Sequence, residues 1–212
     1  MCHPPFVRHA SRLMIFAVIA FTAVCTAAQF WRSDLDWIAI PLSTYLFGPG
    51  GGYVRAVYYL MALGLLGFAR ASYLATAPAR RTVLGSSLLA AAGVILPIVA
   101  ITELFRGTPY EELAHVTHKI AAPATFLWLS FGMLLLSSRW RRDPGLKKGS
   151  LPGVVLAWVA TFVLWFQVLM PGLPNGLMEK LAIALILSWL GWAPYHILST
   201  THRWVTPGSR PG

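Results

Sequence analysis

Six stretches of mostly apolar residues dominate this sequence, and each is close to the roughly 20 residues that an α-helix needs to cross a bilayer. They are residues 13–31, 53–73, 83–102, 116–138, 151–170 and 177–197. Lipid offers the backbone no hydrogen-bonding partners, so a spanning segment must be a helix or a strand of a closed barrel. The short alternating segments of a barrel do not recur along this chain. The sequence therefore predicts an all-α, polytopic membrane protein in which residues 1–212 form a single six-helix transmembrane domain.

The balance of charged and apolar residues supports this class. Charged residues are 11% of the chain and hydrophobic residues 57%, whereas soluble domains average roughly 25% and 45–50%. Too few polar side chains remain to cover a water-soluble particle. In so apolar a chain, the formal net charge of +10 favours an anionic membrane surface over nucleic acid. We therefore expect membrane lipids, and no nucleic acid, as partners.

The distribution of Lys and Arg predicts the orientation of the helices. If the N-terminus is cytoplasmic, twelve of the 17 basic residues fall inside, namely Arg8, Arg12, Arg70, Arg80, Arg81, Arg139, Arg141, Arg142, Lys147, Lys148, Arg203 and Arg210. The remaining five fall outside, namely Arg32, Arg55, Arg106, Lys119 and Lys180. An excess of basic residues in short loops marks the cytoplasmic side. The prediction is an N-in, C-in, multi-pass protein of a bacterial-type plasma (inner) membrane.

The first apolar stretch has some features of a secretory signal. Arg8 and Arg12 precede an apolar run, and residues 26–28 make a weak cleavage site. The run continues to Trp31 and is long enough to span, so we expect it to be retained as the first helix. Cys2 is then cytoplasmic and Cys25 lies in the membrane, so no disulfide is expected between them.

Ionisable residues deep in a membrane usually mark function, and the central portions of these six stretches carry none. A proton-coupled pump normally needs a carboxylate or a basic partner at that depth, so transport by this route is disfavoured. The polar residues present, such as Thr22, Gln29 and Thr161, are typical of hydrogen bonds between helices.

The ionisable groups gather instead at the predicted outer ends of the helices. We predict a polar pocket there, partly covered by residues 48–52 and formed by Ser43, Arg55, Glu111, His115, His118 and Lys180. Its basic side chains would donate charge-assisted hydrogen bonds to an anionic lipid headgroup or a small solute. The alternative is that these residues belong to separate, solvated helix ends that interact weakly.

A second alternative is enzymatic. Glu111, His115 and His118 share one face of a helix at 100° per residue, and two imidazoles with a carboxylate suit zinc or another divalent metal. Asp34 or Asp36 could complete such a site. A metal-bound water would attack an ester or amide of a lipid, with Ser43 donating to the developing oxyanion. The sequence thus leaves a metal-dependent hydrolase or transferase open beside a non-catalytic pocket.

Haem is not expected as a cofactor. A bis-His haem in a helical bundle needs two histidines at similar depth. His196 follows the start of its predicted helix by nineteen residues, which places it about 28 Å from the end where His115 and His118 lie. We interpret His196 as an interfacial anchor on the cytoplasmic side.

Three stretches resemble a known family. They are residues 41–51 (PLSTYLFGPGG), His115 with His118 after an acidic loop, and the Gly176-Leu177-Met178-Glu179-Lys180 entry to the last helix. With the layout of the whole chain, they resemble the six-helix bacterial and archaeal membrane proteins grouped as domain of unknown function 998. The resemblance implies the six-helix architecture and carries no established reaction. The family's usual Pro-x-Asp before the fourth helix is replaced here by Thr108-Pro109-Tyr110-Glu111, so an Asp-dependent role does not carry over.

Overall fold

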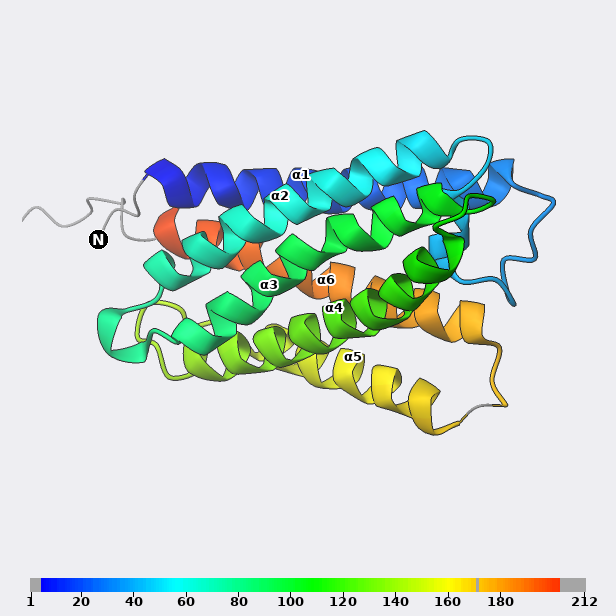
Figure 1. Ribbon diagram of the computed structural model, residues 1–212. Helices are drawn as coiled ribbons and strands as arrows, with labels where there is room; N and C mark the ends of the chain where they lie inside the picture. The colour runs from blue at the N-terminus through cyan, green and yellow to red at the C-terminus, as the bar shows by residue number, and fades with distance from the viewer. Residues whose placement is uncertain (1–4, 171, 203–212) are drawn as a thin grey trace, which may run out of the picture.

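The computed structural model describes residues 5–170 and 172–202, and within these ranges all regular structure is helical (Figure 1). The long helices are α1 (Pro5–Trp31), α2 (Gly51–Ala75), α3 (Val83–Thr102), α4 (Glu111–Trp140), α5 (Leu151–Leu169) and α6 (Asn175–His202). Three short 3₁₀ helices lie in the connections, η1 (Leu42–Leu46), η2 (Pro78–Arg80) and η3 (Glu103–Phe105). Six helices are long and apolar enough to cross a membrane. The six predicted spans are confirmed, although α1 begins at Pro5 rather than at residue 13.

Local chemistry explains where several helices begin. Gly50 caps α2 with φ 78°, a left-handed conformation that costs glycine little. Thr82 caps α3, where its hydroxyl accepts a hydrogen bond from the Gly85 amide at 3.2 Å. Pro152 lies in the first turn of α5, where its missing N–H has no intrahelical partner to lose.

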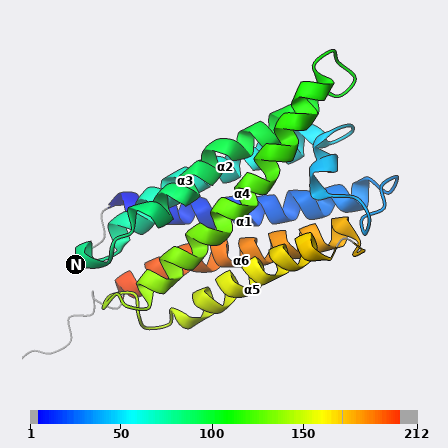
Figure 2. The same ribbon diagram turned by 60° about the horizontal axis from the view of Figure 1, so that its bottom comes forward.

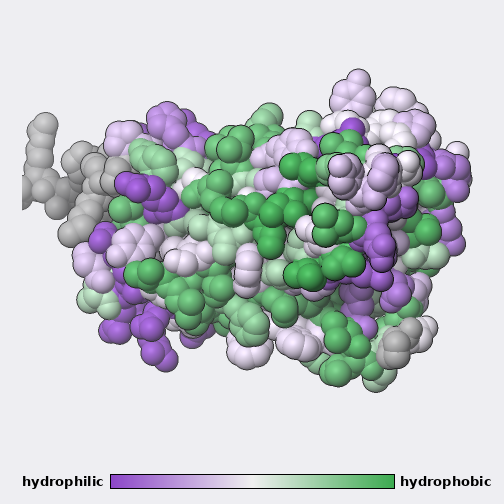
Figure 3. Space-filling model, in the orientation of Figure 1, coloured by the Kyte–Doolittle hydropathy of each residue, from purple (hydrophilic) through white to green (hydrophobic). Residues whose placement is uncertain are grey.

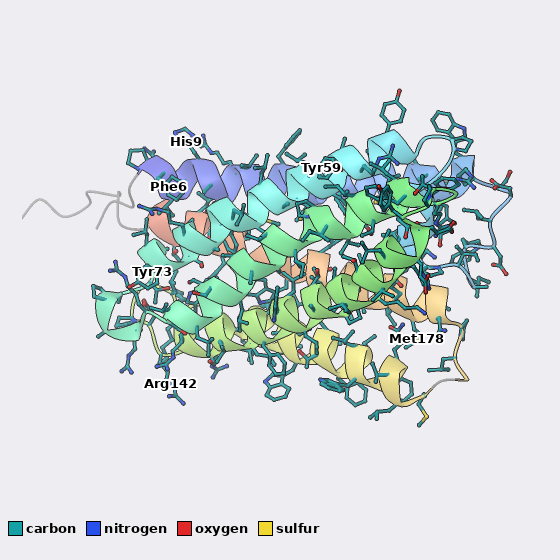
Figure 4. The ribbon with its side chains drawn as sticks, in the orientation of Figure 1. Phe6, His9, Tyr59, Tyr73, Arg142 and Met178 are labelled. Atoms are coloured by element: carbon teal, nitrogen blue, oxygen red, sulfur yellow. The ribbon has the colours of Figure 1, made fainter. Side chains whose placement is uncertain are left out.

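The helices pack in chain order around the bundle. α1 packs on α2, α2 on α3, α3 on α4 and α5 on α6, while α6 returns to α1 (Figures 1 and 2). Residues 32–50, 103–110 and 172–174 lie between helices at one end, which we call the loop end (Figure 1). The start of α1 and the finish of α6 lie at the opposite end with residues 76–82 and 141–150, which we call the terminal end. Figure 4 labels Arg142 at the terminal end and Met178 at the loop end.

The surface follows the same division. Hydrophobic side chains form a broad band across the middle of the molecule, and hydrophilic side chains gather at both ends (Figure 3). Ten of the twelve basic residues assigned to the inside lie at the terminal end. The other two, Arg203 and Arg210, lie outside the described residues. The five remaining basic residues lie toward the loop end.

The terminal end is closed by stacked aromatic rings. Trp140 stacks on Trp189 with ring centroids 5.9 Å apart, and Trp192 stacks on His196 at 4.8 Å. His196 is buried, and its Nε2 donates to the Leu146 carbonyl at 2.8 Å. The interpretation of His196 as an interfacial anchor is therefore wrong: the ring packs in the bundle and fastens the α4–α5 connection.

A buried carboxylate joins two connections at this end. Asp143 accepts hydrogen bonds from the backbone amides of Ala77 at 2.7 Å and Gly145 at 2.8 Å. Trp140 Nε1 adds a bond to Thr76 Oγ1 at 3.0 Å. The α2–α3 connection is thereby fixed to the α4–α5 connection.

Candidate functional site

The candidate site is a cavity of about 420 Å³ at the loop end. Its deep part is apolar and is lined by Phe21, Tyr58, Met61, Leu65, Leu96, Val99, Leu129, Ile186 and Leu190. Its mouth is polar and is lined by Ser43, Thr44, Glu103, Arg106, His115, His118, Lys119 and Glu179. The arrangement is amphipathic, with charge at the end of the bundle and hydrocarbon toward its middle.

The cavity exists because α4 and α6 separate. Trp140 and Trp189 hold the two helices together at the terminal end, whereas α4 diverges from α5 and α6 toward the loop end (Figure 2). The α4 residues that line the cavity recur at helical spacing, as in His115, His118 and Ala122, so they share one face. Pro123 also lines it, and its ring nitrogen cannot donate to the Lys119 carbonyl four residues earlier.

An acid–histidine group forms one side of the mouth. Glu103 is buried at the start of η3, and its Oε2 lies 2.6 Å from Arg106 Nε. Its Oε1 lies 3.3 Å from Nδ1 of His118. The Thr102 hydroxyl donates to the Val99 carbonyl at 2.9 Å and lies 3.0 Å from the same Nδ1, so it accepts from that nitrogen. Nδ1 therefore carries the proton, and Nε2 is the ring atom available to a ligand.

Three of the six predicted pocket residues line the cavity, namely Ser43, His115 and His118. The other three bind backbone atoms instead. Arg55 donates to the Leu46 carbonyl, Glu111 accepts from the Gly107 amide at 2.9 Å, and Lys180 donates to the Trp37 carbonyl at 2.7 Å. These side chains fix loops at the same end of the molecule rather than forming the cavity wall.

The roof of the cavity is η1 with the residue before it. Pro41, Ser43 and Thr44 line the cavity from above, whereas none of residues 48–52 does. The expected cover by residues 48–52 is therefore replaced by η1. Gly51, the first residue of α2, packs so closely on the Leu46 carbonyl that a Cβ at this position would overlap it. This contact holds the start of α2 against the end of η1.

Charged side chains fasten the roof from several directions. Glu179 Oε1 accepts from the Leu42 amide at 3.0 Å, and Lys180 Nζ donates to the Ile40 carbonyl at 2.5 Å. The same ammonium lies 5.8 Å from the ring centroid of Tyr45, within the range of a cation–π contact. Tyr45 is buried, and burial raises the pKa of its phenol.

The two aspartates that could complete a metal site form hydrogen bonds within the α1–α2 connection. Arg32 donates to Asp34 at 2.8 Å and to the Phe47 carbonyl at 2.9 Å. The hydrogen bond from Arg32 lowers the pKa of the Asp34 carboxyl. Asp36 accepts from the Ile38 amide at 2.8 Å.

No metal group is assembled among the described side chains. Among the side chains described in residues 5–170 and 172–200, no three His, Cys, Asp or Glu lie close enough together to hold a metal ion. Zinc at Glu111, His115 and His118 stays a prediction, and it would require Glu111 to leave the Gly107 amide.

Five residues of the mouth are not among the six predicted pocket residues, namely Thr44, Glu103, Arg106, Lys119 and Glu179. Glu103 carried a signal in the sequence, because it is an acid directly after an apolar stretch, at the same predicted end as His118. Its pairing with that imidazole depends on how α3 and α4 pack. Helical spacing within one segment does not contain this information.

Comparison with known proteins identifies one family. A family model described as protein of unknown function (DUF998) matches residues 15–194, from the third turn of α1 into the last third of α6. The match contains every residue that lines the cavity. No curated protein and no solved structure matches the chain.

Proposed function

This chain belongs to the DUF998 family of proteins of unknown function, and we propose that it binds a membrane lipid in the loop-end cavity. The headgroup lies at the polar mouth, and part of an acyl chain lies in the apolar interior. One observation carries the proposal: a single cavity of about 420 Å³ has charged residues at its mouth and an apolar wall below them.

The size and lining of the cavity support a lipid over a small polar solute. Small-molecule pockets typically measure about 300–1,000 Å³ and are mostly apolar with a few polar groups. A polar solute would leave the wall around Met61, Leu65 and Leu129 without apolar contacts. A lipid chain fills that wall, and the remainder of the lipid stays in the bilayer.

The fixed roof supports entry from the membrane rather than from water. Glu179 and Lys180 hold the chain around η1 through its backbone, and Arg55 holds its last residue. The separation of α4 from α6 lies on the side of the bundle, so a lipid reaches the cavity laterally without moving the roof.

The mouth supplies donors for a phosphate. Arg106, His115 and Lys119 line it and are exposed, and cationic donors form strong, short hydrogen bonds to phosphate oxygens. The Nε2 atom of His118 adds a further group that can bond to a headgroup.

Orientation decides which leaflet supplies the lipid. The excess of basic residues at the terminal end supports a cytoplasmic location for that end, which makes the loop end extracytoplasmic and the outer leaflet of the inner membrane the source. Reporter fusions should place Gly145 in the cytoplasm and both Gly48 and Gly107 outside. An extracytoplasmic Gly145 would reverse the assignment.

The proposal is tested by blocking the cavity. In the purified protein, a fluorescent phospholipid should bind and should be displaced by unlabelled phospholipid, but not by its deacylated headgroup. Ala122 lines the cavity on α4, so Ala122→Phe should weaken binding about tenfold, or by about 1.4 kcal/mol. The control is Ile120→Phe on the same helix, whose side chain is 66% exposed. Equal affinities of the two variants would contradict the proposal.

One observation favours a metal-dependent enzyme as the second candidate. Glu103 orients Nδ1 of His118, and carboxylates commonly orient metal-binding histidines in this way. Metal analysis of the purified protein separates the candidates. One equivalent of zinc, lost in a His115→Ala/His118→Ala variant, would favour a metal-assisted hydrolase or transferase.

A further inference from the structure

Two charged side chains of the cavity mouth have no ion-pair partner among the residues that the structure describes. They are Glu179 on α6 and Lys119 on α4, and both line the cavity. The second acid of the mouth, Glu103, is buried and already paired with Arg106 and His118. Lys180 partly offsets the charge of Glu179 from the next position of α6, although its ammonium binds two backbone carbonyls. The mouth therefore offers one negative and one positive charge, neither in an ion pair, on its two separated helices.

The Glu179 carboxylate is the more constrained of the two. Its Oε1 accepts from the Leu42 amide at 3.0 Å, and within the described part of the chain its Oε2 has no hydrogen-bond partner. Withdrawing a carboxylate from water is costly unless a cation or donor compensates it. A ligand that brings a cation to Glu179 would supply this compensation.

Two aromatic side chains of the same cavity suit an organic ammonium. Phe21 and Tyr58 line the same cavity with ring centroids 4.9 Å apart, and aromatic faces attract ammonium groups. A cavity that combines a carboxylate with aromatic rings favours a cation that carries hydrocarbon over a fully hydrated metal ion.

We propose that the lipid bound in the cavity is zwitterionic, an amine-bearing phospholipid such as phosphatidylethanolamine. Its ammonium binds Glu179, and its phosphate binds Lys119 with Arg106. The lipid then bridges α4 and α6 where the protein leaves them apart. A purely anionic lipid satisfies Lys119 but gives Glu179 no ion pair and brings a like charge toward it. This inference rests on the proposed lipid binding at the same cavity.

The test compares two phospholipids with identical acyl chains in the purified full-length protein. Phosphatidylethanolamine and phosphatidylglycerol share the phosphate and differ in the ammonium. We expect the wild-type protein to bind phosphatidylethanolamine about tenfold more tightly, as expected if one charge pair contributes about 1.4 kcal/mol. Native mass spectrometry of mixed-lipid titrations measures this ratio directly.

Glu179→Gln isolates the charge. Glutamine keeps an oxygen that can accept from the Leu42 amide, so the roof contact is retained while the negative charge is lost. The variant should bind the two lipids equally. The matched control is Glu112→Gln, an exposed acid at the same end that does not line the cavity, and it should keep the wild-type ratio. Lys119→Gln should weaken both lipids together.

The outcomes distinguish a zwitterionic ligand from lipid binding in general. Loss of the lipid preference in Glu179→Gln alone supports a zwitterionic ligand. Equal binding of both lipids by the wild-type protein, or an equal weakening of both in Glu179→Gln, would overturn the zwitterion while leaving lipid binding intact. Binding of neither lipid would overturn the proposed function itself. Thermal unfolding of each variant in detergent shows that the folded state is retained.

Discussion

The helices α4 and α6 pack together at one end of this bundle and separate at the other. At the terminal end, α4 and α6 are joined by Trp140 and Trp189, whose side chains are fully buried and stacked. At the loop end the same helices enclose a cavity of about 420 Å³. Large rings close one end, whereas at the other end the separation of the two helices leaves a cavity with charged side chains at its mouth.

The difference shows how a membrane bundle can be both stable and receptive. Without a hydrophobic driving force between helices, packing and hydrogen bonds must hold them together, and the terminal end supplies both. Trp189 Nε1 donates to Ser137 Oγ at 2.9 Å, and that hydroxyl donates to the Gly153 carbonyl at 3.2 Å. A well-packed terminal end allows the loop end to remain open to a ligand.

The largest expected effect on stability comes from removing a buried tryptophan ring at the terminal end. Trp189→Ala should lower the free energy of unfolding by about 3–5 kcal/mol, because it removes a fully buried ring and leaves a void. Phe126→Ala, at the edge of the existing cavity, should cost clearly less, because its side chain already lacks neighbours on one side. Thermal unfolding in detergent measures both. Similar losses would show that the two ends are equally packed.

Enlarging a side chain also distinguishes the two ends, because a glycine-to-alanine substitution needs free space around the new methyl group. A Cβ at Gly153 would overlap the Trp192 ring, so Gly153→Ala should cost about 1–3 kcal/mol through overpacking. At the loop end, a Cβ at Gly52 would meet only Arg55, at 3.8 Å, so Gly52→Ala should be neutral or slightly stabilising. An equally stable Gly153→Ala variant would mean that the Trp192 ring is free to move.

Removing a buried charge should also destabilise the protein at the terminal end, whereas removing an exposed charge at the loop end should not. Asp143→Asn should cost about 1–3 kcal/mol, because the buried carboxylate accepts several backbone amides that one amide oxygen cannot satisfy. Asp34→Asn changes an exposed acid of the loop end, so its unfolding temperature should stay at the wild-type value. A silent Asp143→Asn would contradict the role of Asp143 in joining the two connections.

The smallest expected effect on stability comes from loosening the roof. Lys180→Met should cost about 1 kcal/mol, because the carbonyls of Trp37 and Ile40 lose a partly exposed cationic donor. Its effect should be local. Hydrogen exchange should accelerate at Leu42–Leu46 and stay unchanged in the α4–α5 connection. Faster exchange at both ends would show that the roof and the terminal cluster unfold as one unit.

The sequence by itself determined the six helices. A stretch of about 20 apolar residues crosses a bilayer as an α-helix, because every backbone amide and carbonyl must find its hydrogen-bond partner within the segment. The boundaries 83–102 coincide with α3. The helical face shared by His115 and His118 also followed from spacing alone, and both residues line the cavity.

Only the tertiary structure decided which polar side chains meet. Glu179 and Lys180 are neighbours in sequence, yet Glu179 lines the mouth while Lys180 binds the carbonyls of Trp37 and Ile40. Adjacent residues on a helix point about 100° apart, so the rotation of α6 against its neighbours assigns their roles. An apolar helix accepts lipid or protein on nearly any face, and the sequence of such a helix therefore leaves its rotation open until the other helices pack against it.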